Sequence, residues 1–184
     1  YMDSPYIYAQ YSSGVRTHLR LIPPHPFGPP ERCYWGQVTE YPAYICHPFG
    51  QGQAVYLPWF PGTLFYRQGH PNPSLFLADI MERVLRLAPL GGNLPPSVEA
   101  TLLEKPDGSC LLHLVNASGH FGNSFYPPLP LHSLQVTVPF THPPRHVAGL
   151  RSGQLLAFTW ENGNLSISVP QLDLFEAIYI SASI

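Results

Sequence analysis

The sequence predicts an α/β plus all-β protein, in which an α/β segment precedes an antiparallel β-sandwich. Apolar residues recur at helical spacing between residues 72 and 88, whereas after residue 97 the chain carries short apolar runs separated by turn residues. Between these parts, the sequence PLGGNLPP at residues 89–96 breaks any helix. We therefore expect an α/β domain over residues 1–89 and a β-sandwich domain over residues 95–184.

Three short strands are expected in the first half, near residues 19–22, 43–46 and 53–57. Pro58 ends the third strand, because proline has no amide hydrogen to donate to a neighbouring strand. The loop over residues 23–41 is long for a compact domain, and such loops line a site or pack on a partner. The sequence leaves open whether this loop lines a site or packs on a partner.

One helix is expected in the first half, beginning at Asn72 and Pro73 and ending near Leu87. Asn72 is a favourable N-cap, and a proline at the first helical position loses no hydrogen bond. The polar face carries two pairs at i, i+4 spacing, Asp79 with Arg83 and Glu82 with Arg86. The apolar face consists of Leu77, Ile80, Met81, Val84, Leu85 and Ala88.

The second half shows the turn chemistry and alternation of an antiparallel sandwich. The sequences KPDGS and ENGN are each flanked by two apolar runs, which is typical of hairpins. Apolar and polar residues alternate from Leu134 to Phe140, the period of a half-buried strand. The expected strands are residues 98–104, 110–116, 134–140, 155–160, 165–169 and 175–181.

Composition excludes several classes of function. The chain has 45% hydrophobic residues, a net charge of −2, and one lysine, Lys105, beside eight arginines. It therefore lacks the basic stripe that nucleic-acid binding requires. No apolar run is long enough for a membrane span, so we expect a soluble protein, with a cytoplasmic location favoured. The chain begins at Tyr1 without an initiator methionine, from which we expect a piece of a longer polypeptide.

Cysteine and histidine patterns predict neither a disulfide framework nor a metal site. Cys33, Cys46 and Cys110 are widely spaced and form no CxxC pair, so we expect buried, reduced thiols. His142 and His146 have i, i+4 spacing, but the prolines between them prevent a helix that could bring both rings onto one metal. No cofactor motif is present, and we expect no cofactor.

No catalytic residue is assigned from the sequence. Cleavage of a glycosidic bond normally requires two carboxyl groups on opposite sides of that bond. Glu31 and Glu40 flank an aromatic segment, but nothing in the sequence fixes their separation, and we interpret them as surface or capping acids. Cys33 and Cys46 lack the strand-turn-helix context of a nucleophilic cysteine.

An aromatic segment after the third expected strand is the candidate functional site. It is interpreted as a loop, and its flat aromatic faces with polar tips suit stacking against sugars. The same residue types also anchor protein interfaces, and the sequence leaves both interpretations open. The candidate residues are Trp59, Phe60, Phe65, Tyr66, Arg67 and His70.

Residues 50–88 resemble the end of the trimerisation domain of glycoside hydrolase family 42 β-galactosidases and related glycosyl hydrolases. The resemblance rests on a strand at Ala54 to Leu57, on PW at residues 58–59, GTLFY at 62–66 and GHP at 69–71, and on the helix that follows. Segments TLL, HLVN and LFEA of the second half are similar to the β-sandwich that follows this domain in such enzymes.

The resemblance implies a partial amidotransferase-like α/β domain followed by a C-terminal β-sandwich. It further implies a non-catalytic region of a glycoside hydrolase that serves oligomerisation, with an upstream (β/α)₈ barrel of the same polypeptide as a partner. Family members carry their catalytic glutamates on that barrel, so the resemblance assigns no catalytic residue to this chain. The expected function is therefore oligomerisation and scaffolding, with a homo-oligomer as the expected state. The alternative is a carbohydrate-binding module that uses the aromatic segment around Trp59 and Tyr66.

Overall fold

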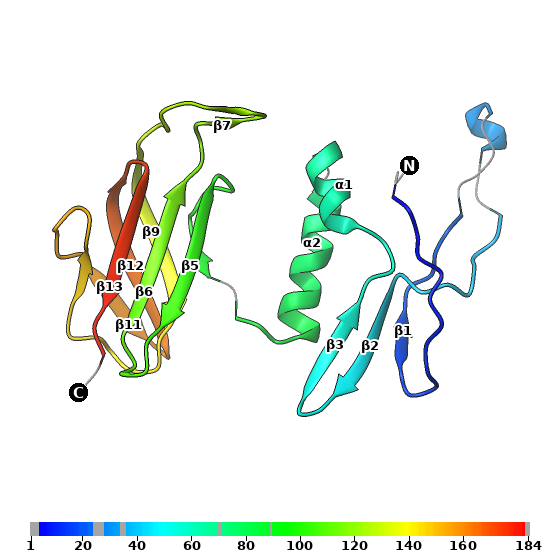
Figure 1. Ribbon diagram of the computed structural model, residues 1–184, viewed down its shortest axis with the longest axis horizontal. Coiled ribbons are helices and arrows are strands. Elements are labelled where there is room, and N and C mark those ends of the chain that lie inside the picture. Colours follow the sequence, from blue (N-terminus) through cyan, green and yellow to red (C-terminus); the bar gives the residue numbers. More distant parts are fainter. Residues whose placement is uncertain (1–3, 24–27, 34–35, 70, 89, 183–184) are drawn as a thin grey trace. The chain divides into compact units, whose positions relative to one another are not determined.

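The computed structural model describes residues 4–23, 28–33, 36–69, 71–88 and 90–182 (Figure 1). Backbone contacts divide the chain into two compact units, Tyr1–Leu87 and Ala88–Ile184, called unit 1 and unit 2 below. Unit 1 combines a small sheet with helices, and unit 2 consists of strands. No helix in the described part of the chain is long and apolar enough to cross a membrane.

The sheet of unit 1 has three antiparallel strands in the order β1-β2-β3 (Figure 1). These are β1 (Arg16–His18), β2 (Tyr44–Phe49) and β3 (Gly52–Tyr56). The second and third strands were predicted, but a strand over residues 19–22 was wrong. Leu19 takes a positive φ of 54°, which ends the ladder, and Leu21 instead exchanges backbone hydrogen bonds with Thr39 and Tyr41.

Two helices follow the sheet. Helix α1 (Pro61–Gln68) precedes α2 (Pro71–Asp79), which continues as the π-helical turn η2 (Ile80–Val84), and a 3₁₀ turn, η1 (Pro30–Arg32), interrupts the long loop. The predicted helix is therefore present, but it includes Pro71, so Asn72 lies inside it and is not its N-cap. Asp79 forms the expected ion pair with Arg83 at 2.6 Å. Glu82 and Arg86, both described, form no ion pair, because Arg86 lies beyond the helix with a φ of 56°.

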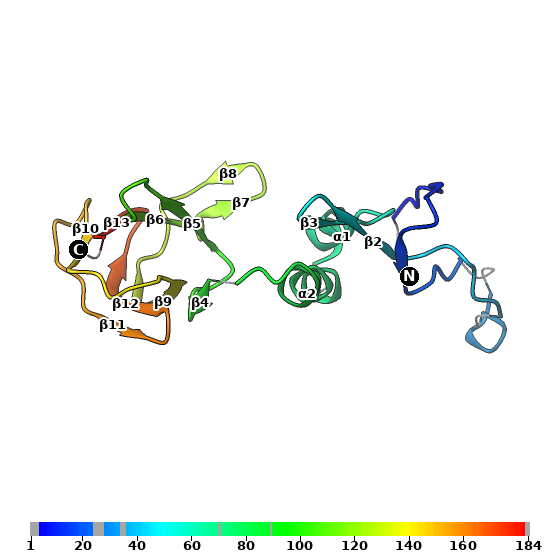
Figure 2. The same cartoon turned by 90° about the horizontal axis from the view of Figure 1, so that it is seen from below.

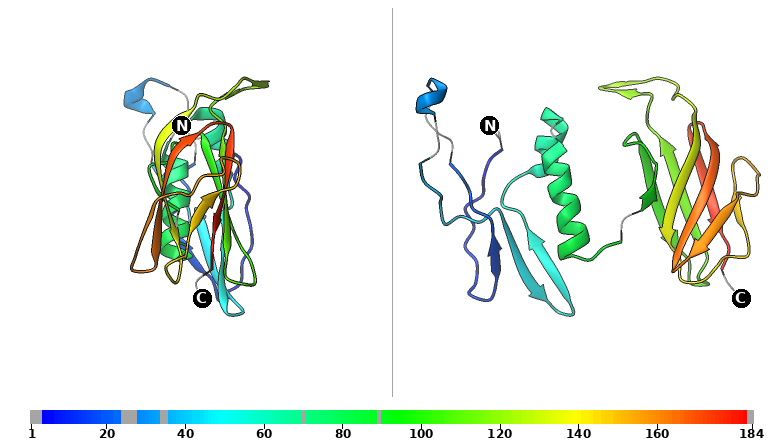
Figure 3. Two further views of the ribbon diagram at one scale, coloured as in Figure 1. Left: turned by 90° about the vertical axis from the view of Figure 1, so that its left-hand side faces the viewer. Right: turned by 180° about the vertical axis from the view of Figure 1, so that it is seen from behind.

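Unit 2 is a β-sandwich-like domain built from two four-stranded antiparallel sheets, which Figure 2 shows as separate layers. One sheet has the order β10-β13-β6-β5 and the other β11-β12-β9-β4, and β7 and β8 form a separate hairpin (Figure 3). The strands are β4 (Gly91–Gly92), β5 (Val98–Glu104), β6 (Cys110–Asn116), β7 (His120–Phe121), β8 (Ser124–Phe125), β9 (Leu131–Pro139), β10 (Val147–Gly149), β11 (Phe158–Glu161), β12 (Asn164–Leu172) and β13 (Phe175–Ile180).

The strand β4 lies within residues 89–96, in which the sequence analysis predicts no strand. Gly92 has a φ of 115°, and a Cβ there would lie 1.9 Å from the carbonyl oxygen of Gln135 on β9. Only glycine permits this close approach of two backbones, so the residues that break the helix also form the edge of a sheet. Asn93 extends the contact, since its side-chain oxygen accepts a hydrogen bond from the backbone amide of Gln135 at 2.7 Å.

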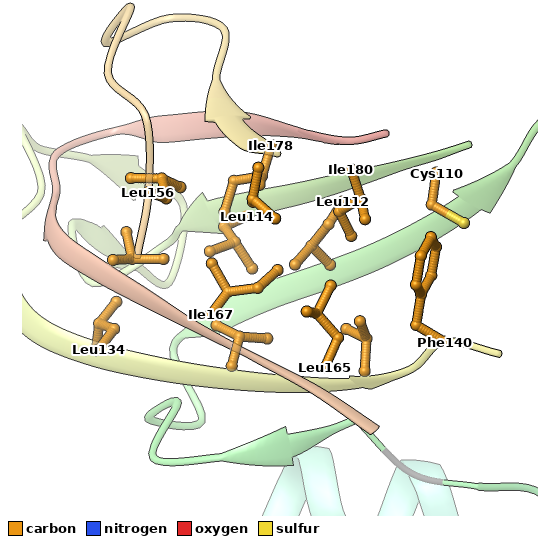
Figure 4. Close-up of a cluster of buried hydrophobic side chains, with 14 of the residues drawn as sticks. Cys110, Leu112, Leu114, Leu134, Phe140, Leu156, Leu165, Ile167, Ile178 and Ile180 are labelled. Carbon is orange, nitrogen blue, oxygen red and sulfur yellow. The ribbon is translucent and has the colours of Figure 1, made fainter. Parts of the chain in front are cut away.

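The core of unit 2 lies between its two sheets (Figure 4). Alternate residues of β6, β9, β12 and β13 point inward, and Leu112, Leu114, Ile167 and Ile178 are essentially inaccessible to solvent. Burial of one such side chain contributes about 1.5–3 kcal/mol. The alternation read in the sequence therefore produces a continuous apolar layer.

One buried polar side chain ties the loops of the sandwich together. The Asn116 amide donates hydrogen bonds to the carbonyl oxygens of Leu129 and Asp173, both at 2.8 Å. Its oxygen accepts a bond from the Ser118 amide at 3.1 Å. Because the polar atoms of this 1% exposed residue are paired, its burial fixes loop positions without a large desolvation cost.

Candidate functional site

The aromatic segment predicted as a loop is mostly helix α1. Pro61 stands at its first turn, and Gly69, with a φ of 64°, closes it with a backbone hydrogen bond to Phe65 at 2.8 Å. Proline near the start and glycine just past the end are the usual signals of a helix. Those two residues were the signal that the sequence interpretation missed.

Trp59 is an anchor inside unit 1. Its indole N–H donates a hydrogen bond to the Ala43 carbonyl oxygen at 2.8 Å, and its ring lies 5.7 Å from that of Phe76 on α2. The side chain is half-buried between the strand segment and the helix. One ring face and the polar tip are thus occupied within the chain.

The other described rings of the segment are exposed. Phe60 and Phe65 are each 45% accessible and Tyr66 is 88% accessible; together they are called the α1 aromatic surface below. Arg67 is exposed next to Tyr66, and His70 lies outside the described residues. The structure therefore separates the predicted site residues into one internal anchor and a set of outward-facing side chains.

A second group of rings, which the sequence interpretation missed, lies at the N-terminal segment. The Tyr8 ring is 4.7 Å from that of Tyr41 and 5.2 Å from that of Tyr6. The Tyr6 hydroxyl donates to the Pro42 carbonyl oxygen at 2.8 Å, and burial raises the pKa of this phenol. The signal available in the sequence was the tyrosine-rich opening, YIYAQY.

The acidic residues considered as catalytic candidates lie exposed on the surface of unit 1. Glu40 forms an exposed ion pair with Arg20 at 3.1 Å, and Glu31 lies exposed in η1. Glu176 is the one carboxylate that is buried among the described residues. It accepts backbone hydrogen bonds from Arg151, Ser152 and Ala177 at 2.8 to 3.1 Å, which makes it the organiser of a turn.

The histidines and cysteines that the structure describes form no recognisable centre. Within the described ranges, no group of three or more His, Cys, Asp and Glu side chains could hold a metal ion. His146 packs its ring 5.8 Å from Tyr179. All three cysteines are free; Cys46 and Cys110 are buried, and burial raises the pKa of the Cys110 thiol, whereas Cys33 is half-buried.

Unit 2 carries a polar depression of about 470 Å³. Its lining includes Arg151, Gln154, Gln171, Asp173, Phe175 and Glu176. Several of these side chains interact with one another. The Arg151 guanidinium lies 5.0 Å from the centre of the Phe175 ring, and the Gln171 side-chain amide donates a hydrogen bond to the Asp173 carboxylate at 2.7 Å. The polar groups of the depression therefore have partners within the chain, and the depression belongs to the surface of the turn that Glu176 holds in place.

The fold is similar to part of a glycoside hydrolase of known structure. Alpha-L-fucosidase isoenzyme 2 from Paenibacillus thiaminolyticus matches with a TM-score of 0.59 and 18% sequence identity, over 82% of this chain and 24% of that chain. Unit 2 accounts for 97 of the 184 residues, so this likeness extends into both units. The chain spans about a quarter of the fucosidase.

A second solved structure is a cycloisomaltooligosaccharide glucanotransferase from Paenibacillus sp., complexed with cycloisomaltoheptaose. It matches with a TM-score of 0.41 and 17% identity, over 49% of this chain and 16% of that chain. No family model and no curated protein matches the sequence. At 18% identity, the likeness to the fucosidase concerns the fold alone.

Proposed function

We propose that this chain is a non-catalytic region of a glycoside hydrolase, in which unit 1 packs against a catalytic (β/α)₈ barrel or a second subunit. The observation that carries this proposal is the fold likeness to about a quarter of a fucosidase, extending over both units. The buried carboxylate of the described residues is bonded to three backbone amides, which fits a scaffolding role.

The surface of unit 1 supports a role in assembly. Phe60, Phe65 and Tyr66 are exposed within a stretch of seven residues, and Tyr8 and Tyr41 of the second group of rings are exposed as well. Apolar patches larger than a few hundred Å² are unusual on a monomer and mark interfaces. Aromatic rings are also the residues that dominate binding energy when an interface buries them.

The finer assignment within this proposal is the one that the sequence motifs imply. Unit 1 would be the end of an amidotransferase-like domain, as in the trimerisation domain of family 42 β-galactosidases, and unit 2 the C-terminal sandwich. The strand at residues 52–56, the segment around α1 and the helix α2 occupy the positions of the quoted motifs. This assignment makes a homo-oligomer the expected state of the complete protein.

Two measurements test the proposed function. The isolated chain should not hydrolyse chromogenic galactosides or fucosides, and light scattering after size exclusion should show a subunit assembly that Phe65→Ser with Tyr66→Ser weakens. Exposed Tyr126→Ser in unit 2 is the matched control and should leave the assembly unchanged. Turnover that disappears on substitution of one acidic residue would overturn the non-catalytic assignment.

Carbohydrate binding is the second candidate function, and the exposure of Phe65 and Tyr66 beside Arg67 favours it. Sugar rings stack on aromatic faces while their hydroxyls require hydrogen bonds. Calorimetric titration with galacto-oligosaccharides should show saturable binding that Tyr66→Ala removes and Tyr126→Ala retains. Absence of saturable binding at millimolar sugar excludes this function for the α1 aromatic surface.

A further inference from the structure

Unit 1 contains a cleft whose lining is rich in cationic side chains. It has a volume of about 520 Å³ and lies between strands β1 and β2, the β2–β3 turn and the end of the helical segment. This basic cleft is lined by Arg16, His18, Tyr44, Gln53, Arg83 and Arg86, among others. No carboxylate belongs to its described lining.

Strand register explains how β1 contributes two of these side chains. Arg16 pairs with Cys46 and His18 with Tyr44, so all four side chains lie on one face of the sheet. On this face Cys46 is only 1% exposed, and the Tyr44 ring contacts Phe76 of α2 at 5.7 Å. Where β2 places buried and aromatic residues, the edge strand β1 places an arginine and a histidine.

Contacts within the cleft orient the histidine. The His18 ring stacks on Tyr44 with centroids 4.7 Å apart and an angle of 13° between the planes. A stacked imidazole keeps its ring edge, with both nitrogen atoms, available for hydrogen bonds. The tyrosine therefore acts as a platform for a polar group.

The helix end contributes Arg83 and Arg86, and the second of these stands in an unfavourable backbone conformation. Arg86 has a φ of 56°, at a position after the helix where glycine is the usual residue. A side chain in this region carries a conformational cost, and such residues concentrate at functional sites. The chain therefore has an arginine at a position whose backbone conformation favours glycine.

The charges of the cleft are only partly balanced within the chain. Asp79 pairs with Arg83 at 2.6 Å. Over the ranges that the structure describes, the guanidinium groups of Arg16 and Arg86 have neither an ion pair nor a hydrogen bond. Two positive charges thus face one concave surface without a counter-charge.

We propose that the basic cleft binds a small oxyanion, namely the carboxylate, phosphate or sulfate group of a low-molecular-weight ligand. Guanidinium groups bind these groups through paired, charge-assisted hydrogen bonds. The volume lies within the range of small-ligand sites, about 300–1,000 Å³. The Gln53 side chain and His18 add further hydrogen-bond donors for the remaining polar atoms of such a ligand.

Calorimetric titration of the full chain with inorganic phosphate and with sulfate, at ionic strength fixed by chloride, tests this site. Wild-type protein should bind at least one of them saturably, and Arg16→Gln should weaken the affinity about tenfold, as expected for loss of a charge-assisted bond. Arg145→Gln, in unit 2, makes the same charge change at an exposed position and should leave the affinity unchanged.

Arg86→Gly separates binding from folding. Glycine accepts the φ of 56° without strain, so this variant should unfold at or above the wild-type midpoint while its affinity for the oxyanion falls.

Parallel titrations with glucuronate, glucose 6-phosphate and glucose identify the source of the anion: tighter binding of either charged sugar than of the inorganic ion supports a sugar acid or ester, and equal binding supports recognition of the oxyanion alone. Absence of saturable binding of every anion, or equal weakening by Arg145→Gln, would overturn the proposal.

Discussion

The two units of this protein bury their apolar residues to very different extents. Unit 2 buries the fifteen core residues that lie between its sheets, whereas unit 1 buries only four hydrophobic residues among those described, Ile45, Cys46, Leu64 and Ile80. Conversely, fifteen of the exposed large hydrophobic side chains belong to residues 7–87 and ten to residues 103–175. Since both units have similar lengths, unit 2 has the larger apolar core of its own, and the exposed apolar side chains of unit 1 are what the proposed assembly would cover.

The largest effect is expected from a core truncation in unit 2. Leu114→Ala removes a side chain with no solvent exposure from the sandwich and should cost about 2–5 kcal/mol of unfolding free energy. Chemical denaturation measures this loss of stability, and hydrogen exchange of peptides from unit 2 assigns it to that unit. Leu103→Ala, at a 51% exposed position of β5, is the control and should change stability by less than about 0.5 kcal/mol.

Next in size is the effect of the buried carboxylate. Glu176→Gln replaces one acceptor oxygen by a donor that faces backbone amides, so it should destabilise unit 2 by roughly 1.5–3 kcal/mol. Thermal unfolding compares this variant with Glu161→Gln, which makes the same change at an exposed acid. Equal midpoints for the two variants would contradict the structural role of Glu176.

A matched pair of tryptophans sharpens the comparison between units. The indole groups of Trp59 in unit 1 and Trp160 in unit 2 each donate to a backbone carbonyl oxygen at 2.8 Å. Trp→Phe at either position should cost about 1 kcal/mol. Hydrogen exchange should assign each loss to the unit that carries the substitution, and a loss shared by both units would show that they unfold together.

Exposed rings of unit 1 should contribute little to its stability. Tyr66→Ser should change the unfolding free energy by no more than about 0.5 kcal/mol, because the ring is 88% exposed. Leu64→Ala on the same helix is the contrast, since this residue is 2% exposed and its truncation should cost about 2 kcal/mol or more. Destabilisation by Tyr66→Ser as large as that by Leu64→Ala would mean that the ring belongs to the core.

The smallest expected effect concerns the β5–β6 turn. Hydrogen bonds from the Ser109 hydroxyl and amide hold the pKa of the Asp107 carboxyl below its ordinary value. A depressed pKa in the folded state means that the stabilisation is present above the unfolded-state pKa and is lost as pH falls through the folded-state pKa. Wild-type protein should therefore lose slightly more stability than Asp107→Asn when pH is lowered from neutral to below 4, as measured by urea denaturation. A steeper loss in the variant would contradict this.

Local sequence signals determined the sandwich and the helix at residues 71–84. Alternation from Leu134 to Phe140 and the turn sequences KPDGS and ENGN predict β9 and two hairpins because period and turn chemistry are properties of neighbouring residues. The apolar spacing and the Asp79–Arg83 pair likewise predict the helical segment.

Only the tertiary structure decided how distant residues meet. It used Trp59 as an anchor on Ala43, paired Gly92 with β9, and placed Arg16 and Arg86 in one cleft. These outcomes depend on strand register, on backbone approach and on which side chains neighbouring elements cover. Such properties arise from contacts between residues far apart in the chain, so no local period or motif encodes them.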